Sequence, residues 1–169
     1  MPGSADISKN RKFQLRLINK VKNSLKNDDV FKDMCKECGV SIDVIDLIPV
    51  KFGPLEVSAR TANAVITLND NLLTDGRFEM IPNLLIHEIK HHIDQVFGDH
   101  ATQGAQQGDY LRNEDEASAF KIQLEYMADH FGKGEAERYS EHLLDHHDKK
   151  GPERAELKEE LLSKVDDGV

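Results

Sequence analysis

Three residues between positions 87 and 91 have the types and spacing of a metal-centred hydrolytic site. His87, Glu88 and His91 form the pattern H-E-x-x-H. On a helix, residues four apart lie one turn above each other, so His87 and His91 can both bind one ion. Glu88 is turned to the side of that pair, where its carboxylate can act on a water molecule without binding the metal. The pattern predicts a zinc site that hydrolyses peptide bonds.

A catalytic zinc site needs a third protein ligand and one open position for water. The sequence offers the acidic cluster "NEDEASAF", residues 113–120, where a helix is expected to begin. Carboxylates are favoured in the first turn of a helix by its dipole. Asp115 falls opposite the apolar stripe of that helix and should face water, whereas Glu114 and Glu116 flank the stripe. Periodicity alone does not choose between Glu114 and Glu116.

The remaining histidines are weaker candidates for the third ligand. His92 points about 100° away from His91 on a helix, so it should not share the ion. His100 lies in a loop rich in glycine and polar residues, and it stays open as a ligand. Solvated histidines are expected on the charged helix that contains "HLLDHH", namely His142, His146 and His147. The alternative for His87 and His91 is a pair of surface histidines beside a core stripe.

Two helices must position these groups. The first is "MIPNLLIHEIKHHIDQVF", with Pro82 in the first turn, where proline is tolerated. Its far side is expected to be buried through Leu84, Leu85, Ile89, Ile93 and Val96. The second is "RNEDEASAFKIQLEYMADHF", which should end at Gly132 and Gly134. Its apolar stripe consists of Ala117, Phe120, Leu124, Met127 and Phe131.

The rest of the chain predicts an α+β fold, mostly helical with a small three-stranded sheet. Helical spacing and β-branched alternation give the expected elements, which are helices at 8–27, 29–38, 135–147 and 152–165, one strand in 40–50 and two in 55–70. The strand "AVITLN" is expected at the edge of the sheet, where it would bind a substrate backbone. Because the sequence has no repeat or low-complexity linker, a single domain over residues 1–169 is expected.

The composition is that of a soluble globular chain, with 38% hydrophobic and 31% charged residues. The formal net charge of −9 argues against nucleic acids and anionic membranes as partners. The sequence has no apolar run long enough to span a membrane, and its first residues show no apolar signal region. The expected locations are therefore the cytoplasm, or secretion by a non-Sec route. Nothing in the sequence indicates the oligomeric state.

Cys35 and Cys38 form a C-x-x-C pair. A four-sulfur zinc site would need a second pair of cysteines. A redox pair usually lies at the start of a helix after a strand, whereas this pair lies near the end of an expected helix, before Gly39. Two reduced thiols without a chemical role are therefore expected.

The segments "HEIKHHID" and "EDEASAF" resemble the gluzincin branch of the zincin metallopeptidases. The pattern is similar to minimal gluzincins of the ImmA/IrrE type and to HtpX-like peptidases, without the membrane spans of the latter. The resemblance covers residues 81–131 apart from the intervening loop, and it implies a zincin-like fold with Glu114 as the third zinc ligand. Ala117 would let the two helices approach. Ser118 departs from the pattern, since those families often place Asp or Asn there to orient a ligating histidine; Asp94 could take that role.

The expected function is a zinc-dependent endopeptidase, a regulatory or effector protease that uses Zn²⁺ to hydrolyse peptide bonds in a protein substrate. Glu88 is the expected catalytic base. Tyr110 or His100 is the expected donor to the oxyanion, with Tyr126 and Tyr139 as further options. Two alternatives stay open: a catalytically silent zincin-fold binding protein, and an acidic helical interaction protein with chance histidines.

Overall fold

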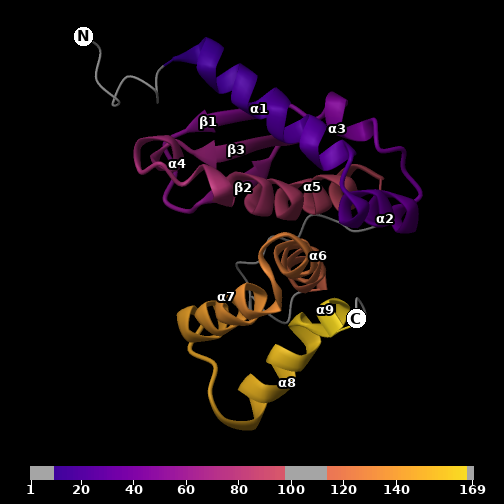
Figure 1. Cartoon of the computed structure of the whole chain (residues 1–169), viewed down its shortest axis with the longest axis vertical. Helices are drawn as coiled ribbons and strands as arrows, with labels where there is room; N and C mark the ends of the chain where they lie inside the picture. The colour runs from indigo at the N-terminus through magenta and orange to yellow at the C-terminus, as the bar shows by residue number, and fades with distance from the viewer. Residues whose placement is uncertain (1–9, 98–113, 167–169) are drawn as a thin grey trace. The chain divides into compact units, whose positions relative to one another are not determined.

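The computed structural model describes residues 10–97 and 114–166 of the chain. The chain divides into two compact units, Met1–Gly98 and Asp99–Val169. The predicted α+β character is confirmed, because the described residues are mostly helical and contain a small three-stranded sheet (Figure 1). Within these same residues, no helix has both the length and the apolar character needed to cross a bilayer. That the two units form one domain stays a prediction.

The first two helices begin and end where their caps dictate. Helix α1 (Arg11–Lys26) begins after Asn10 and helix α2 (Asp29–Cys38) begins after Asp28. In both, the side-chain oxygen of the capping residue accepts a hydrogen bond from a backbone N–H of the first turn. Helix α2 ends at Gly39, whose φ of 73° is the left-handed conformation that glycine adopts without strain. Both helices confirm the sequence prediction.

The strand predicted over residues 40–50 is wrong. The segment contains turns and the short helix α3 (Val44–Leu47), and strand β1 (Val50–Gly53) begins only at its end. The Ser41 hydroxyl oxygen accepts a hydrogen bond from the backbone N–H of Asp43 at 3.1 Å. Such local bonds from serine compete with strand pairing and favour a turn. The buried side chains accordingly follow helical spacing and are those of Val44, Ile45 and Ile48.

The sheet has the strand order β1-β3-β2. Strands β2 (Ala59–Ala62) and β3 (Val65–Asn69) pair antiparallel and confirm the two strands predicted after residue 55. They are joined by a turn in which Asn63 and Ala64 both have positive φ, as two-residue hairpin turns require. Strand β1 pairs parallel with the other side of β3. The prediction that "AVITLN" is an edge strand is therefore wrong, because β3 is the central strand.

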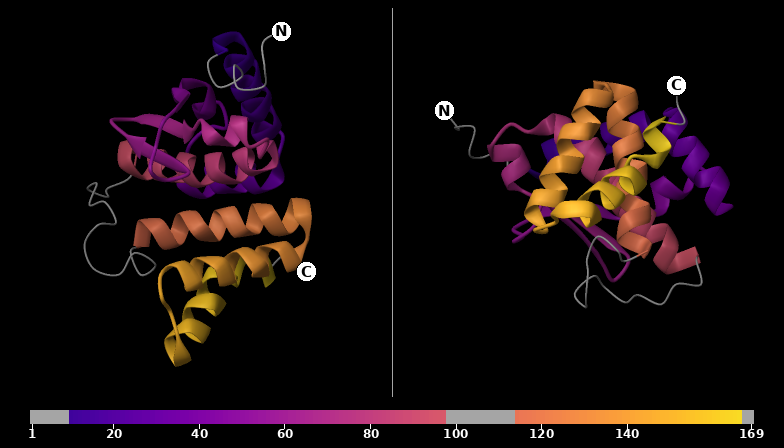
Figure 2. Two further views of the ribbon diagram at one scale, coloured as in Figure 1. Left: turned by 90° about the vertical axis from the view of Figure 1, so that its left-hand side faces the viewer. Right: turned by 90° about the horizontal axis from the view of Figure 1, so that it is seen from below.

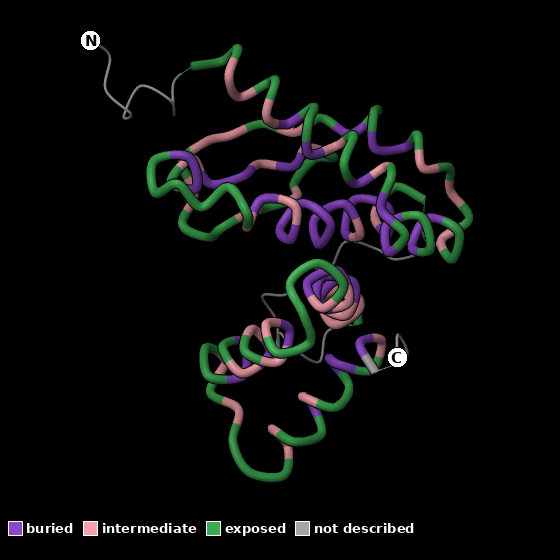
Figure 3. Tube along the Cα trace, in the orientation of Figure 1, coloured by how far each residue is buried: buried purple, intermediate pink, exposed green. Residues whose placement is uncertain are grey.

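Helix α5 (Ile81–Phe97) contacts β2, β3 and α1. It follows α4 (Asn71–Thr74) and the short 3-10 helix η2 (Phe78–Met80). The predicted helix is confirmed, and buried residues occur along most of its length (Figure 3). Four of the five predicted core residues are buried, namely Leu84, Leu85, Ile89 and Ile93. Val96 is 50% exposed in the last turn, so its predicted burial is wrong.

The second unit consists of helices α6 (Glu114–Phe131), α7 (Lys133–His146), α8 (Gly151–Leu161) and α9 (Ser163–Asp166). Figure 2 shows α6 and α7 side by side within this unit, and these helices are in contact. The predicted helices are confirmed, except that a break at Leu162 separates α8 from α9. Gly132 ends α6 with a φ of 98°, whereas Gly134 lies inside α7 and breaks nothing.

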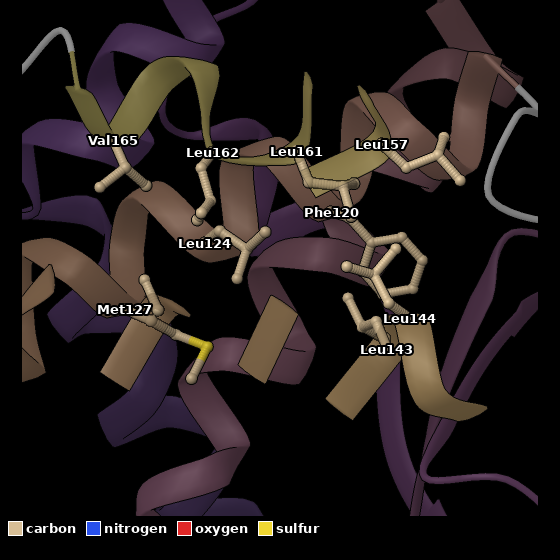
Figure 4. Packing of buried hydrophobic residues seen from close by; sticks show 10 residues of the cluster. Phe120, Leu124, Met127, Leu143, Leu144, Leu157, Leu161, Leu162 and Val165 are labelled. Carbon is tan, nitrogen blue, oxygen red and sulfur yellow. The ribbon is translucent and has the colours of Figure 1, made fainter. Parts of the chain in front are cut away.

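The core of the second unit is an apolar cluster contributed by all four helices (Figure 4). Three residues of the predicted stripe on α6 belong to it, namely Phe120, Leu124 and Met127. Phe131, the last residue of the predicted stripe, is 45% exposed, so its predicted burial is wrong. Arg154 links α8 to α7 through hydrogen bonds to the carboxylates of Asp145 and Glu141. The second unit therefore combines an apolar core with polar contacts between α7 and α8.

Asn69, at the end of β3, holds the segment that leads into β2. Its side-chain amide donates to the carbonyl oxygens of Leu55 and Val57, each at 2.9 Å, and its oxygen accepts from the backbone N–H of Asn71 at 3.0 Å. We expect Asn69→Ala to lower the free energy of unfolding by about 1–2 kcal/mol, because three hydrogen bonds of a buried group are lost. Urea denaturation measures this change.

Asn69→Asp is the matched variant, since it keeps the size but turns a carboxylate oxygen toward two carbonyl oxygens. It should destabilise the protein as well. An Asn69→Asp protein as stable as the wild type would contradict the proposed role of the amide.

Candidate metal centre

Helix α5 places His87 and His91 one turn apart on one face. Both side chains are buried, with exposed fractions of 5% and 9%. The ring centroids are 4.9 Å apart and the planes meet at 69°. One ring nitrogen of each residue lies within 4.8 Å of the other, close enough for both to bind one ion. The alternative of two surface histidines is therefore wrong.

Glu88 is buried beside this pair, with an exposed fraction of 8%. Its Oε1 accepts a hydrogen bond from the Thr61 hydroxyl of β2 at 2.7 Å. Its Oε2 lies 3.9 Å from Nε2 of His87. A buried carboxylate is costly unless it is hydrogen-bonded, so the contact with Thr61 stabilises Glu88 in this position. The carboxylate thus has one oxygen on the sheet and the other beside the histidine pair.

The donor atoms of this face suit a borderline-soft divalent cation. Imidazole nitrogen is a preferred ligand of Zn²⁺, and two imidazoles spaced four apart on a helix can chelate it. Their burial restricts the access of bulk water, which is typical of functional metal sites. The residues of the first unit therefore fit two ligands of a zinc ion and a neighbouring carboxylate base.

His92 and Asp94 flank this face without belonging to the pair. Burial lowers the pKa of His92, which favours the neutral form of its imidazole. Both oxygens of Asp94 accept hydrogen bonds from Lys90 Nζ at 2.7 Å. Asp94 is thus engaged by a neighbour one turn away on the same helix. Its role in orienting His91 stays a prediction.

The first turn of α6 contains the three carboxylates that the sequence singled out. Glu114 is exposed, whereas Asp115 and Glu116 are half-buried. The prediction that Asp115 faces water is therefore met only in part. Glu116 precedes the buried Ala119 and Phe120 by three and four residues, so it lies on their side of the helix. Glu114 lies on the other side, and its assignment as a zinc ligand stays a prediction.

The remaining predicted site residues are outside the described part of the chain or belong to the second unit. Tyr110 and His100 are outside the described residues, as is the loop between Gly98 and Gly108. Tyr126 is buried in α6 with its ring stacked on His130 at a centroid distance of 4.1 Å. On α7, the predicted exposure of the histidines is confirmed for His142 and His146, whereas His147 is half-buried.

Thr61 is the residue that the sequence analysis missed. In the sequence it is one of several threonines, and the only hint is its place in a hairpin before the H-E-x-x-H helix. Its importance depends on which face of β2 packs against α5. In the antiparallel pairing of β2 with β3, Thr61 lies opposite Ile66, which is fully buried. Thr61 therefore lies on the buried face of the sheet.

Comparison of the chain with protein-family models, curated proteins and solved structures found no match. The resemblance to the gluzincins therefore rests on the motifs alone and stays a prediction. The chemistry of the site depends on His87, Glu88 and His91 and on the contacts that hold them.

The two cysteines should differ strongly in reactivity. Burial raises the pKa of the Cys35 thiol to about 11, with a smaller contribution from Cys38. At pH 8 about one Cys35 thiol in a thousand is then ionised, and the thiolate is the reactive form. We expect iodoacetamide to alkylate the half-buried Cys38 well before the buried Cys35 in the folded protein. Mass spectrometry of timed samples measures both rates.

Cys38→Ala should leave only slow labelling, and Cys35→Ala should keep the fast phase. Equal rates at both cysteines in the folded protein would contradict the expected protection of Cys35.

Proposed function

We propose that this protein is a zinc-dependent endopeptidase that hydrolyses peptide bonds in a protein substrate. The observation that carries the proposal is the position of Glu88 Oε2, 3.9 Å from Nε2 of the buried His87, which is itself paired with His91. A carboxylate in that position can receive a proton from a water beside the histidine pair. An acidic interaction protein with chance histidines would have no need of this buried arrangement.

The zinc ligands are His87, His91 and one carboxylate from the first turn of α6. We favour Glu116 as the third ligand. It is half-buried, whereas Glu114 is exposed. The resemblance to the gluzincins supports Glu114 instead.

Zn²⁺, when bound, supplies a positive charge that makes water more acidic and polarises the carbonyl of the peptide bond. Glu88 acts as the general base and accepts the proton of the attacking water at Oε2. It then gives this proton to the amine that leaves when the peptide bond breaks. The burial of Glu88 strengthens its interaction with developing charge, because the surroundings screen it less than water does.

The substrate backbone binds along β2 rather than β3. Strand β3 is paired on both sides, whereas β2 is an outer strand of the described sheet. The backbone groups on the outer side of β2 can form hydrogen bonds with an extended peptide. Strand β2 also contains Thr61, which contacts Glu88, so a peptide added there would lie next to the catalytic base.

We expect the purified wild-type protein to contain about one zinc per chain. The variant Glu88→Gln should retain that zinc but lose peptide hydrolysis, because the substitution removes only the base. A peptide library made from a cell proteome, with its amines blocked, is the substrate, and mass spectrometry detects new amines. The loss should be at least about 100-fold, the lower end of what general-base catalysis contributes.

His91→Ala is the control that should lose both zinc and hydrolysis. Undiminished hydrolysis by Glu88→Gln would overturn the proposed base. Zinc without any cleavage by the wild type would support a binding protein with this site in place of an enzyme.

Replacement of Glu116 and Glu114 by glutamine separates the two possible third ligands. We expect Glu116→Gln to weaken zinc binding by about 100-fold or more, since loss of a residue that merely orients a ligand already costs about 10- to 100-fold. Glu114→Gln, two residues away, should bind zinc like the wild type. Competition with a chromophoric chelator measures both affinities. The opposite order would identify Glu114 as the ligand.

A further inference from the structure

A single hydroxyl group joins the sheet to the proposed catalytic base. Thr61 Oγ1 lies 2.7 Å from Oε1 of Glu88 and 3.2 Å from the backbone oxygen of the same residue. A hydroxyl has one hydrogen to donate. The carboxylate oxygen is closer than the backbone oxygen and, being charged, is the stronger acceptor. The hydroxyl of Thr61 therefore donates chiefly to Oε1. The other carboxylate oxygen, Oε2, is the one beside His87.

We infer that Thr61 is a positioning residue that orients the carboxylate of Glu88, so that one oxygen is held on the sheet and the other, Oε2, lies beside His87 and accepts the proton. The inference rests on the proposed peptidase function. With Oε1 bound to Thr61, the carboxylate cannot turn about its last bond without breaking a charge-assisted hydrogen bond. Oε2 is thereby kept on the side of His87. Thr61 itself touches no reacting atom and acts only through Glu88.

The Thr61 side chain is held rigidly for two reasons. Threonine is branched at Cβ, which restricts its side-chain rotation. Its backbone is held in the hairpin, where Thr61 pairs with Ile66 of β3, and Ile66 is fully buried. Glutamate, by contrast, has three rotatable side-chain bonds. The hydrogen bond from Thr61 restricts the rotation of the Glu88 side chain. The sheet therefore fixes the position of the Glu88 carboxylate through Thr61.

Three variants test this role. Thr61→Val keeps the shape and branching but removes the hydroxyl, and Thr61→Ser keeps the hydroxyl. Thr67→Val makes the same chemical change on the neighbouring strand. Because Thr67 pairs with Arg60, its side chain lies on the opposite face of the sheet from Thr61. The substrate is the library peptide that the wild type cleaves fastest, with the zinc content of each variant measured alongside.

We expect Thr61→Val to lower kcat by about 10- to 100-fold at unchanged zinc content and KM, since misplacement of a catalytic group by about 1 Å costs up to that much. Thr61→Ser should recover most of the rate, and Thr67→Val should match the wild type. If Thr61 has a purely structural role, Thr61→Val lowers the fraction of enzyme that is folded. The kcat and KM of the folded molecules then stay those of the wild type.

A second measurement does not depend on activity. A double-mutant cycle of Thr61→Val and Glu88→Ala, read by urea unfolding of the metal-free protein, isolates the interaction between the two side chains. We expect the two changes to be non-additive, with the double variant more stable than the sum of the single changes predicts. Additive changes would show that the two side chains do not interact in solution.

The outcomes separate the inference from the proposed function. An active wild type whose kcat survives Thr61→Val overturns the inference alone, as does a rise in KM with kcat unchanged, which would make Thr61 a substrate-binding residue. A wild type that binds zinc and cleaves no peptide overturns the proposed function and the positioning role with it. In that case a non-additive cycle would still identify the contact as structural.

Discussion

The burial of one carboxylate is the constraint on which the rest of this site depends. Glu88 lies beside a helix face that contains two buried imidazoles, and a charged group there is stable only with a hydrogen-bond partner. That partner, Thr61, lies 27 residues earlier in the chain. The sheet and helix α5 must therefore be correctly aligned for Thr61 to form a hydrogen bond with the buried Glu88.

The alignment follows from the hairpin. Positive φ at Asn63 and Ala64 closes a two-residue turn, which sets the register of β2 on β3. That register places Thr61 opposite the buried Ile66, and a slip of one residue would turn the hydroxyl to the other face of the sheet. Asn69 holds the segment before β2 from the other end of β3. The hairpin is thus fixed at both ends, and the position of Glu88 depends on it.

Local patterns predicted the helices well and the sheet only in part. Asp28 and Gly39 mark the ends of α2, and both act through bonds within a few residues. The segment 40–50 looked like a strand because its apolar residues alternate, yet Ser41 starts a turn and α3 follows. The central place of β3 could not be predicted either, since its pairing with β1 joins residues that are distant in sequence. Phe131 and Val96 continue apolar stripes but lie at helix ends, where both are exposed among the described residues.

The sequence by itself determined that His87 and His91 share a face and that Glu88 is turned to the side of that face. Helical geometry at a spacing of four residues is sufficient for this, because it needs no other part of the chain. Only the tertiary structure decided that this face is buried, that β3 is central, and that Thr61 is bound to Glu88. These features depend on strand register and on packing between elements far apart in the chain, which a local pattern does not encode.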